Sequence, residues 1–254
     1  MDQLFFLFLI LLPIATLSSD LTPYEICEKN FTENNMLQAN INNILFDMVA
    51  KSSLRSYAIS SYAAADGCET VYGVTRCQGD MSVQACSACI TKAAQNIRTT
   101  CPDSAKSRIW YEECFLRYDT DDFLGKADKS FADVWESFYA AENPKAFKQA
   151  VGELMGEVMA ATAEGSKKFG YGENHVSGKL TVYGMAQCTR DLGESECYSC
   201  LQNALEAMSD NCENQDGCRI FGSSCFIRYE IYEFFSFNAA GGAAAPAPSI
   251  VIDN

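Results

Sequence analysis

Residues 77–89 read CQGDMSVQACSAC, and residues 188–200 read CTRDLGESECYSC. Both stretches have the spacing C-x(8)-C-x(2)-C, and two more cysteines follow each of them. The five cysteines of the first array return 111 residues later: Cys77, Cys86, Cys89, Cys101 and Cys114 correspond to Cys188, Cys197, Cys200, Cys212 and Cys225. Five cysteines repeated without a gap indicate two copies of one domain.

The repeat also includes residues other than cysteine. The matching segments are Val71-Tyr72-Gly73 with Val182-Tyr183-Gly184, Arg108 with Arg219, and Phe115-x-Arg117-Tyr118 with Phe226-x-Arg228-Tyr229. A length of 254 residues permits one or two domains, and the repeat decides for two. We expect domain 1 at 20–121, a polar linker at 122–130 and domain 2 at 131–237.

The two ends of the chain have distinct compositions. Residues 4–14 are nearly all apolar, and the small polar residues Ser18 and Ser19 follow them. This pattern is typical of a signal peptide, here 1–19, and the run is too short to span a bilayer. A buried N-terminal helix is the alternative interpretation. Residues 238–254 are rich in Ala, Pro and Gly, so we expect a disordered tail.

Composition narrows the class of protein. The chain has 13 cysteines and a net charge of -14. Such acidity disfavours binding to nucleic acids or to anionic membranes. Each copy has only about 105 residues, a size that buries roughly 60 to 70% of the unfolded surface. Covalent cross-links would therefore add much to the stability of each domain.

Hydrophobic periodicity predicts where the first helix of each copy lies. Apolar residues recur at helical spacing within 34–50 and again from Pro144 onward, a proline that favours a first helical turn. They are Leu37, Ile41, Leu45 and Met48 in the first copy, and Phe147, Val151, Leu154 and Val158 in the second. Each copy is therefore predicted to open with a helix.

A strand, a second helix and further strands are expected next. The segments 71–73 and 182–184 are rich in β-formers. The second helix would be capped by Ser82 in the first copy and by Gly193 or Ser195 in the second. From Cys114, and again from Cys225, side chains alternate between two strand faces. The sequence thus predicts an α+β domain with an antiparallel sheet.

The cysteines can form disulfides or bind a metal. Paired C-x(2)-C motifs suit zinc, which prefers four thiolates. Secretion, small domain size and the lack of a histidine near either array favour disulfides. We therefore expect no metal and no cofactor.

The array, with its ending from Arg108 to Tyr118, resembles the ginkbilobin-type domain. This domain, also called the salt-stress response/antifungal domain, occurs in plant secreted proteins and cysteine-rich receptor-like kinases. The resemblance implies two tandem disulfide-stapled domains, each with two helices packed on an antiparallel sheet of about five strands. It also implies the disulfides Cys27–Cys101, Cys77–Cys86, Cys89–Cys114, Cys188–Cys197 and Cys200–Cys225.

The second copy departs from that pairing. Phe138 stands at the counterpart of Cys27, so Cys212 lacks its family partner. Cys218 lies six residues further on, and we expect it to pair with Cys212. Cys68 is then the odd thiol. It is either free and partly buried or joined to a second chain in a dimer.

The sequence gives little support for an enzyme. His175 is the only histidine and lies in the polar segment 172–175, with no nucleophile motif near it. We interpret it as a solvated loop residue. Asp119, Asp121 and Asp122 are interpreted as a solvated face. Asn30 begins the sequon Asn-Phe-Thr, so it is a candidate glycosylation site on the surface.

Carbohydrate binding has a better physical case. The best-known single-domain member of the family is a mannose-binding antifungal lectin that uses an Asn, an Arg and a Glu. The positions in this chain are Glu28, Arg108 and Asp119 in the first copy, and Arg219 and Glu230 in the second. An arginine beside a carboxylate supplies both donors and acceptors to sugar hydroxyls. The family Asn is present in neither copy.

An alternative is that these acids have a structural role. Asp119 and Glu230 would then form exposed ion pairs with Arg117 and Arg228, two residues away on the same strand face. The resemblance implies a secreted, non-enzymatic protein of plant defence or stress response in the apoplast. Its partner would be a mannose-containing glycan or, in the rival interpretation, an extracellular or cell-surface protein, as for a receptor ectodomain.

Overall fold

The computed structural model describes residues 23–32, 35–63, 69–235 and 250–251. The expected signal peptide, Cys68 and most of the expected tail lie outside the described residues. The first copy forms β1 (Tyr24–Asn30), α1 (Asn35–Arg55), β2 (Tyr57–Tyr62), β3 (Val71–Cys77), α2 (Val83–Thr100), β4 (Ser104–Trp110) and β5 (Cys114–Asp119). The second copy forms β6 (Phe131–Glu136), α3 (Pro144–Glu164), β7 (Phe169–Ser177), β8 (Leu180–Cys188), α4 (Glu194–Asn211), β9 (Cys218–Gly222) and β10 (Cys225–Glu230).

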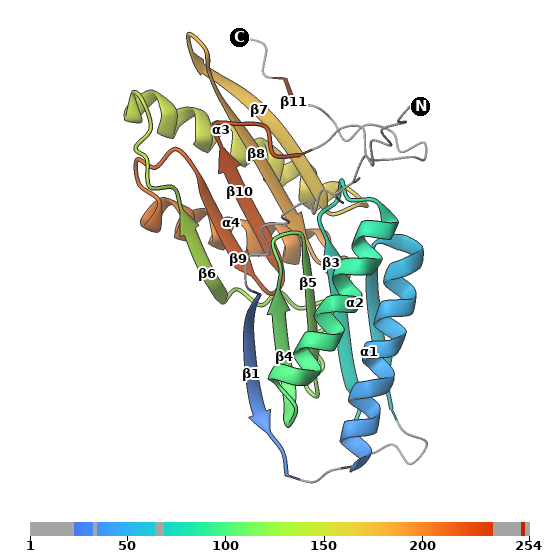
Figure 1. The fold of residues 1–254 in the computed structure, drawn as a ribbon. Helices are drawn as coiled ribbons and strands as arrows, with labels where there is room; N and C mark the ends of the chain where they lie inside the picture. Colours follow the sequence, from blue (N-terminus) through green and yellow to red (C-terminus); the bar gives the residue numbers. More distant parts are fainter. Residues whose placement is uncertain (1–22, 33–34, 64–68, 236–249, 252–254) are drawn as a thin grey trace, which may run out of the picture.

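Each copy is an antiparallel sheet with two helices on one face (Figure 1), which confirms the predicted α+β fold. The strand orders are β1-β4-β5-β3-β2 and β7-β8-β10-β9-β6. A short strand, β11 (Ile250–Val251), extends the second sheet in parallel to β7. The prediction of a disordered tail was therefore wrong for these two residues.

The prediction that each copy opens with a helix was also wrong. Each copy opens with a strand, β1 or β6, and both are edge strands. Their side chains are exposed or half-exposed, so they lack the clear apolar alternation that marks a strand buried on one face. Backbone pairing with β4 and β9 holds them in place, and β1 is also tied to the rest of domain 1 by the Cys27–Cys101 disulfide.

The helices match their sequence signals. In α1 the predicted residues Leu37, Ile41, Leu45 and Met48 are all buried. Pro144 is the first residue of α3. Ser82 caps α2 by accepting a hydrogen bond from the Ala85 amide at 3.1 Å, and Gly193 precedes α4 without a side-chain bond.

Six disulfides join cysteines of the described residues. They are Cys27–Cys101, Cys77–Cys86 and Cys89–Cys114 in domain 1, and Cys188–Cys197, Cys200–Cys225 and Cys212–Cys218 in domain 2. Two of them in each domain link the second helix to the sheet at equivalent places. The third differs, since domain 2 closes a loop between residues only six apart where domain 1 ties β1 to the end of α2.

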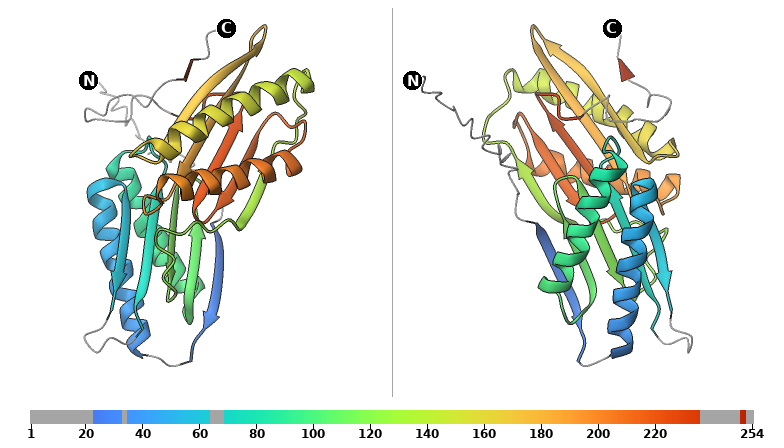
Figure 2. Two further views of the ribbon diagram at one scale, coloured as in Figure 1. Left: turned by 180° about the vertical axis from the view of Figure 1, so that it is seen from behind. Right: turned by 45° about the vertical axis from the view of Figure 1, so that its right-hand side comes forward.

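The two sheets pack on each other through the faces that carry no helix (Figures 1 and 2). A buried aromatic cluster fills this interface: Val74, Trp110, Phe115 and Phe123 from domain 1, and Phe169, Met185, Phe221 and Phe226 from domain 2. Six of these residues form three pairs that are 111 positions apart in the repeat: Val74 and Met185, Trp110 and Phe221, and Phe115 and Phe226. The interface is therefore close to self-complementary, as in a symmetric dimer.

Polar contacts fix the docking of the domains. Trp110 donates its indole N–H to the Gly222 carbonyl at 3.1 Å, and Gln187 donates to the Cys77 carbonyl at 2.8 Å. Arg76 lies between the rings of Phe115 and Phe226. Burial lowers the pKa of Arg76 to about 10, so it stays charged at neutral pH.

Candidate functional site

A layer of charged side chains lies on the interface face of each sheet, beyond the aromatic cluster. In domain 1 it begins on β1 and β4. Arg108 donates to the Glu28 carboxylate at 2.7 Å, and Lys106 approaches the same carboxylate at 3.2 Å. Glu28 stands opposite Lys106 in the strand register, which places it one pleat from Arg108. The structure thus brings Glu28 and Arg108 together.

Asp119 does not join Arg108. It is 1% exposed and pairs with Arg117 at 3.5 Å, with Lys29 at 3.4 Å and, more distantly, with Lys106 at 3.9 Å. The expectations of a solvated Asp119 and of an exposed pair with Arg117 were wrong, since both residues are buried. The alternation of β5 predicted their shared face correctly, but the protein covers that face.

The segment 122–130, expected to be a polar linker, supplies part of this cover. Asp128 accepts hydrogen bonds from Arg108 at 3.4 Å and from Arg117 at 3.3 Å. The Phe123 ring lies 3.9 Å from the Arg117 guanidinium. Burial alone would raise the pKa of Asp128, but hydrogen bonds from Ser130 and the two arginines lower it. The linker therefore covers the two buried arginines of domain 1.

The same layer in domain 2 is connected differently. One carboxylate oxygen of Glu230 accepts from Arg219 at 3.0 Å and from Arg228 at 2.9 Å. Glu230 is one methylene longer than Asp119, so it reaches both arginines. The Phe234 ring lies 4.0 Å from Arg228, at the repeat position of Phe123. The pair between Glu230 and Arg228 is 7% and 6% exposed, so the expectation of an exposed pair was wrong here too.

Each predicted arginine also reaches the β-turn of the other domain. Arg108 donates to the Ser223 hydroxyl at 3.1 Å, and Arg219 donates to the Glu112 carboxylate at 2.7 Å. Ser223 and Glu112 stand 111 residues apart, so the two contacts are equivalent. Burial opposes the charge on Arg219, yet Glu230 and Glu112 raise its pKa above the ordinary value.

Arg219 and Glu230 line an open cleft of about 510 Å³. Three aromatic residues, Trp135, Tyr139 and Tyr232, share the lining with them. Tyr139 is 73% exposed and Tyr232 is 52% exposed. The remaining lining residues are Glu136, Ser137, Asp216, Gly217 and Ile231. The cleft thus combines fixed charges with exposed aromatic rings.

Several of these residues escaped the sequence analysis. Lys106 lies two residues before Arg108 in β4. Residues two apart in a strand share a face, so this spacing could have placed Lys106 beside Arg108. Asp128, Glu112 and Tyr139 carry no such signal, because their roles depend on the segments that cover the sheets. The remaining predicted sites are exposed: Asn30 at the end of β1, and His175, which lies in strand β7 rather than in a loop.

Comparison with known proteins identifies the fold. The family model described as salt stress response/antifungal matches residues 26–121 and 135–232. The chain belongs to the salt stress response/antifungal family. Its relatives include cysteine-rich repeat secretory protein 55 of Arabidopsis thaliana, 32% identical, with the match covering 90% of this chain and 89% of the relative. Another is an antimicrobial ginkbilobin-2-like protein of Castanea crenata, 29% identical over 83% of this chain and 88% of the relative.

A solved structure of the family has the same tandem arrangement. The tandem DUF26 ectodomain of the Arabidopsis thaliana cysteine-rich receptor-like protein PDLP8 matches with a TM-score of 0.71 and 28% identity, covering 83% of this chain and 98% of that chain. The chain is a secreted, cysteine-rich member of this family, as its secretory relatives are. None of the described helices has the length and apolarity needed to cross a bilayer. The described residues contain no cluster of three or more side chains arranged to hold a metal ion.

Proposed function

We propose that this protein is a non-enzymatic binding protein of plant defence that binds mannose-type carbohydrate through the cleft of domain 2. The observation that carries the proposal is the joint lining of that cleft by Arg219, Glu230 and exposed aromatic rings. Arg219 supplies fixed donors and Glu230 supplies fixed acceptors. Aromatic rings offer apolar faces on which the C–H face of a sugar ring can pack.

Preorganisation favours this cleft over the layer of domain 1. Arg219 is held by Glu230 and Glu112, so a sugar hydroxyl meets a group that is already oriented. In domain 1, Arg108 is 7% exposed and is already bonded to Glu28, Asp128 and Ser223. The Arg219 side chain is more exposed, at 16% against 9% for Arg108, and it lines the open cleft. The proposal therefore assigns the binding to Arg219 and Glu230.

Calorimetric titration of the full chain with methyl mannoside and mannose oligosaccharides tests the proposal. We expect Arg219→Gln to weaken binding by about tenfold or more, the loss expected for a charge-assisted hydrogen bond. Tyr139→Ala should weaken binding several-fold, roughly the worth of one exposed ring. The matched control is Tyr198→Ala, a partly exposed tyrosine on α4 outside the cleft.

Thermal unfolding of each variant checks that the fold survives. If the unaltered protein binds no mannoside, or if Arg219→Gln and Tyr139→Ala bind as well as the unaltered protein does, the carbohydrate proposal fails.

A second candidate function is binding of an extracellular protein. Phe138 is 100% exposed and is followed by Tyr139, and Ile231 and Tyr232 add further exposed apolar surface at the cleft. Clustered exposed apolar residues of this kind often mark a binding surface. Pull-down from cell-wall extracts with Phe138→Ser as control, with and without periodate oxidation of glycans, separates the candidates. Capture that survives periodate but is lost in Phe138→Ser favours a protein partner.

A further inference from the structure

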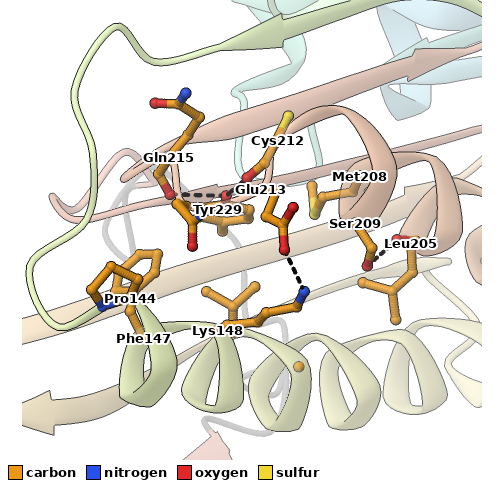
Figure 3. Close-up of a pocket in the computed structure, with 13 residues that line it drawn as sticks. Pro144, Phe147, Lys148, Leu205, Met208, Ser209, Cys212, Glu213, Gln215 and Tyr229 are labelled. Atoms are coloured by element: carbon orange, nitrogen blue, oxygen red, sulfur yellow. Dashed lines mark hydrogen bonds and ion pairs between the residues drawn. The ribbon is translucent and has the colours of Figure 1, made fainter.

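Domain 2 has a second cavity, on the helix side of its sheet. It lies between α3 and α4 and has a volume of about 170 Å³ (Figure 3). Its walls are mainly apolar, formed by Phe147, Val151, Leu205, Met208 and the ring of Tyr229. Tyr229 and Glu230 point to opposite faces of β10, so this α3–α4 pocket is separate from the cleft.

Charged groups meet only at the mouth of the α3–α4 pocket. The Lys148 ammonium lies 3.3 Å from the Glu213 carboxylate, and Figure 3 shows this pair joining α3 to the turn that follows α4. Both side chains are more than 60% exposed, so the pair contributes at most about 1 kcal/mol and can open at little cost. The two charges cancel, so the mouth selects neither an anion nor a cation.

The floor of the pocket is neutral and its polar atom is already bonded. The Tyr229 hydroxyl donates to the backbone carbonyls of Gln215 at 3.1 Å and Cys212 at 3.3 Å. Burial raises the pKa of Tyr229, which keeps this hydroxyl protonated at physiological pH. A ligand therefore meets an aromatic face rather than a charge.

In domain 1 an arginine lies beside the tyrosine that is equivalent to Tyr229. Arg98 stands at the repeat position of Ser209. Its guanidinium hydrogen-bonds the Pro102 carbonyl at 3.5 Å and lies at Tyr118, the counterpart of Tyr229. Gln38 of α1, with its amide turned to suit its neighbours, also accepts from Arg98 at 2.8 Å. In domain 2 the shorter Ser209 lines the pocket at this position.

We propose that the α3–α4 pocket binds a neutral, apolar molecule the size of a single ring, such as a substituted benzene. Its volume is close to the roughly 150 Å³ of apolar cavities that stay dry and bind benzene. Its lining offers dispersion contacts and few free polar groups, which disfavours a sugar or an ion. The volume of about 170 Å³ limits the ligand to about one ring.

The test uses the full chain with methyl-labelled methionine and NMR detection. Toluene should shift the Met208 methyl resonance, which lies in the wall of the pocket, with saturable binding. Benzoate and benzylamine, which match toluene in size but carry opposite charges, should bind at least about tenfold more weakly, since burying a charge is costly. Naphthalene should bind more weakly than toluene because it exceeds the volume.

The variant test places in domain 2 the arginine and glutamine that lie together in domain 1, Arg98 and Gln38. The double substitution Ser209→Arg with Lys148→Gln should weaken toluene binding by at least about tenfold, whereas Ser53→Arg, on an exposed position of α1, should leave it unchanged. The reciprocal Arg98→Ser should create a toluene site in domain 1, read at a second set of resonances.

The proposal is overturned if toluene does not shift Met208 in the unaltered protein, or if either charged analogue binds as tightly as toluene. The size and charge series needs no variant, so loss of folding in Ser209→Arg cannot obscure the result. Mannoside binding at the cleft should be the same with and without toluene, which keeps this inference separate from the carbohydrate proposal.

Discussion

The two domains carry the same two arginines at equivalent strand positions, yet they expose the surroundings of these arginines differently. In domain 1, Arg108 and Arg117 are covered by Asp128 of the connecting segment. In domain 2, Arg219 and Glu230 line an open cleft. The comparison teaches that a repeat determines which side chains share a face, whereas segments outside the repeat determine whether that face is covered or open as a cleft.

The helix side of the domains shows the same principle. Tyr118 and Tyr229 are equivalent, but Arg98 lies beside the first, whereas the shorter Ser209 and the second line a pocket. The third disulfide differs as well, since domain 1 closes a long loop and domain 2 a short one. These differences can be tested by comparing a substitution in one domain with a control substitution elsewhere in the chain.

The largest expected effect concerns the third disulfide. Removing Cys27–Cys101, whose cysteines are 74 residues apart, should lower the free energy of unfolding by about 4.5 kcal/mol in the chain-entropy model. Removing Cys212–Cys218, six residues apart, should lower it by about 2.4 kcal/mol. Urea unfolding of the two double serine variants measures this. Equal losses would show that loop length does not determine how much each disulfide stabilises the protein.

The next effect concerns the docking of the domains. A Cβ added at Gly79 would lie 2.2 Å from the buried ring of Phe169 in the other domain. We expect Gly79→Ala to destabilise the protein by about 1–3 kcal/mol, the usual cost of overpacking. The control is Gly156→Ala in α3, where the added carbon meets open space and should stabilise the helix by up to about 1 kcal/mol. A thermal midpoint unchanged in Gly79→Ala would contradict the docked arrangement.

A third prediction compares the acceptor that covers the arginines of domain 1 with the acceptor of Arg219 in domain 2. Asp128→Asn should cost about 2 kcal/mol at pH 7, because two buried arginines lose a charged acceptor. Glu112→Gln, which affects an acceptor with 39% side-chain exposure, should cost less than about 1 kcal/mol. Denaturant unfolding at pH 7 measures both. Similar losses of stability would mean that covering the arginines of domain 1 does not strengthen their contact with Asp128.

The same variant gives a pH dependence. The pKa of Asp128 is lowered in the folded state, so its contribution is present above the unfolded pKa of about 4 and is lost as pH falls through the folded value. The stability difference between the unaltered protein and Asp128→Asn should therefore shrink below about pH 4. A difference that stays constant down to pH 2 would contradict the assignment.

The smallest effect concerns a polar asymmetry in the aromatic cluster. Trp110 bonds the Gly222 carbonyl, whereas its counterpart Phe221 has no such donor. Trp110→Phe should cost about 1 kcal/mol, because it removes a buried hydrogen bond but keeps most of the ring. Trp135→Phe, which loses a partly exposed bond to Asp133, should cost less. Unfolding in urea compares the two, and a larger cost for Trp135→Phe would be the opposite of the expected order.

Local patterns predicted the regular elements where burial on one side is strong. The periodicity around Leu45 and the proline at Pro144 predicted helices that the structure contains. The edge strands β1 and β6 were missed, because half-exposed strands lack a clear pattern and depend on pairing with distant segments. The cysteine spacing predicted the repeat. The missing family partner of Cys212 led to the prediction that it pairs with Cys218, and the structure contains this disulfide.

The sequence alone determined that two copies of one cross-linked domain follow each other, because fixed cysteine spacing and strand alternation are local properties of the chain. It also determined that Arg108 and Arg219 occupy equivalent positions. Only the tertiary structure decided that Asp119 is buried and that Arg219 and Glu230 line a cleft. The reason is that alternation assigns a side chain to a face, whereas its exposure depends on which distant segments pack on that face.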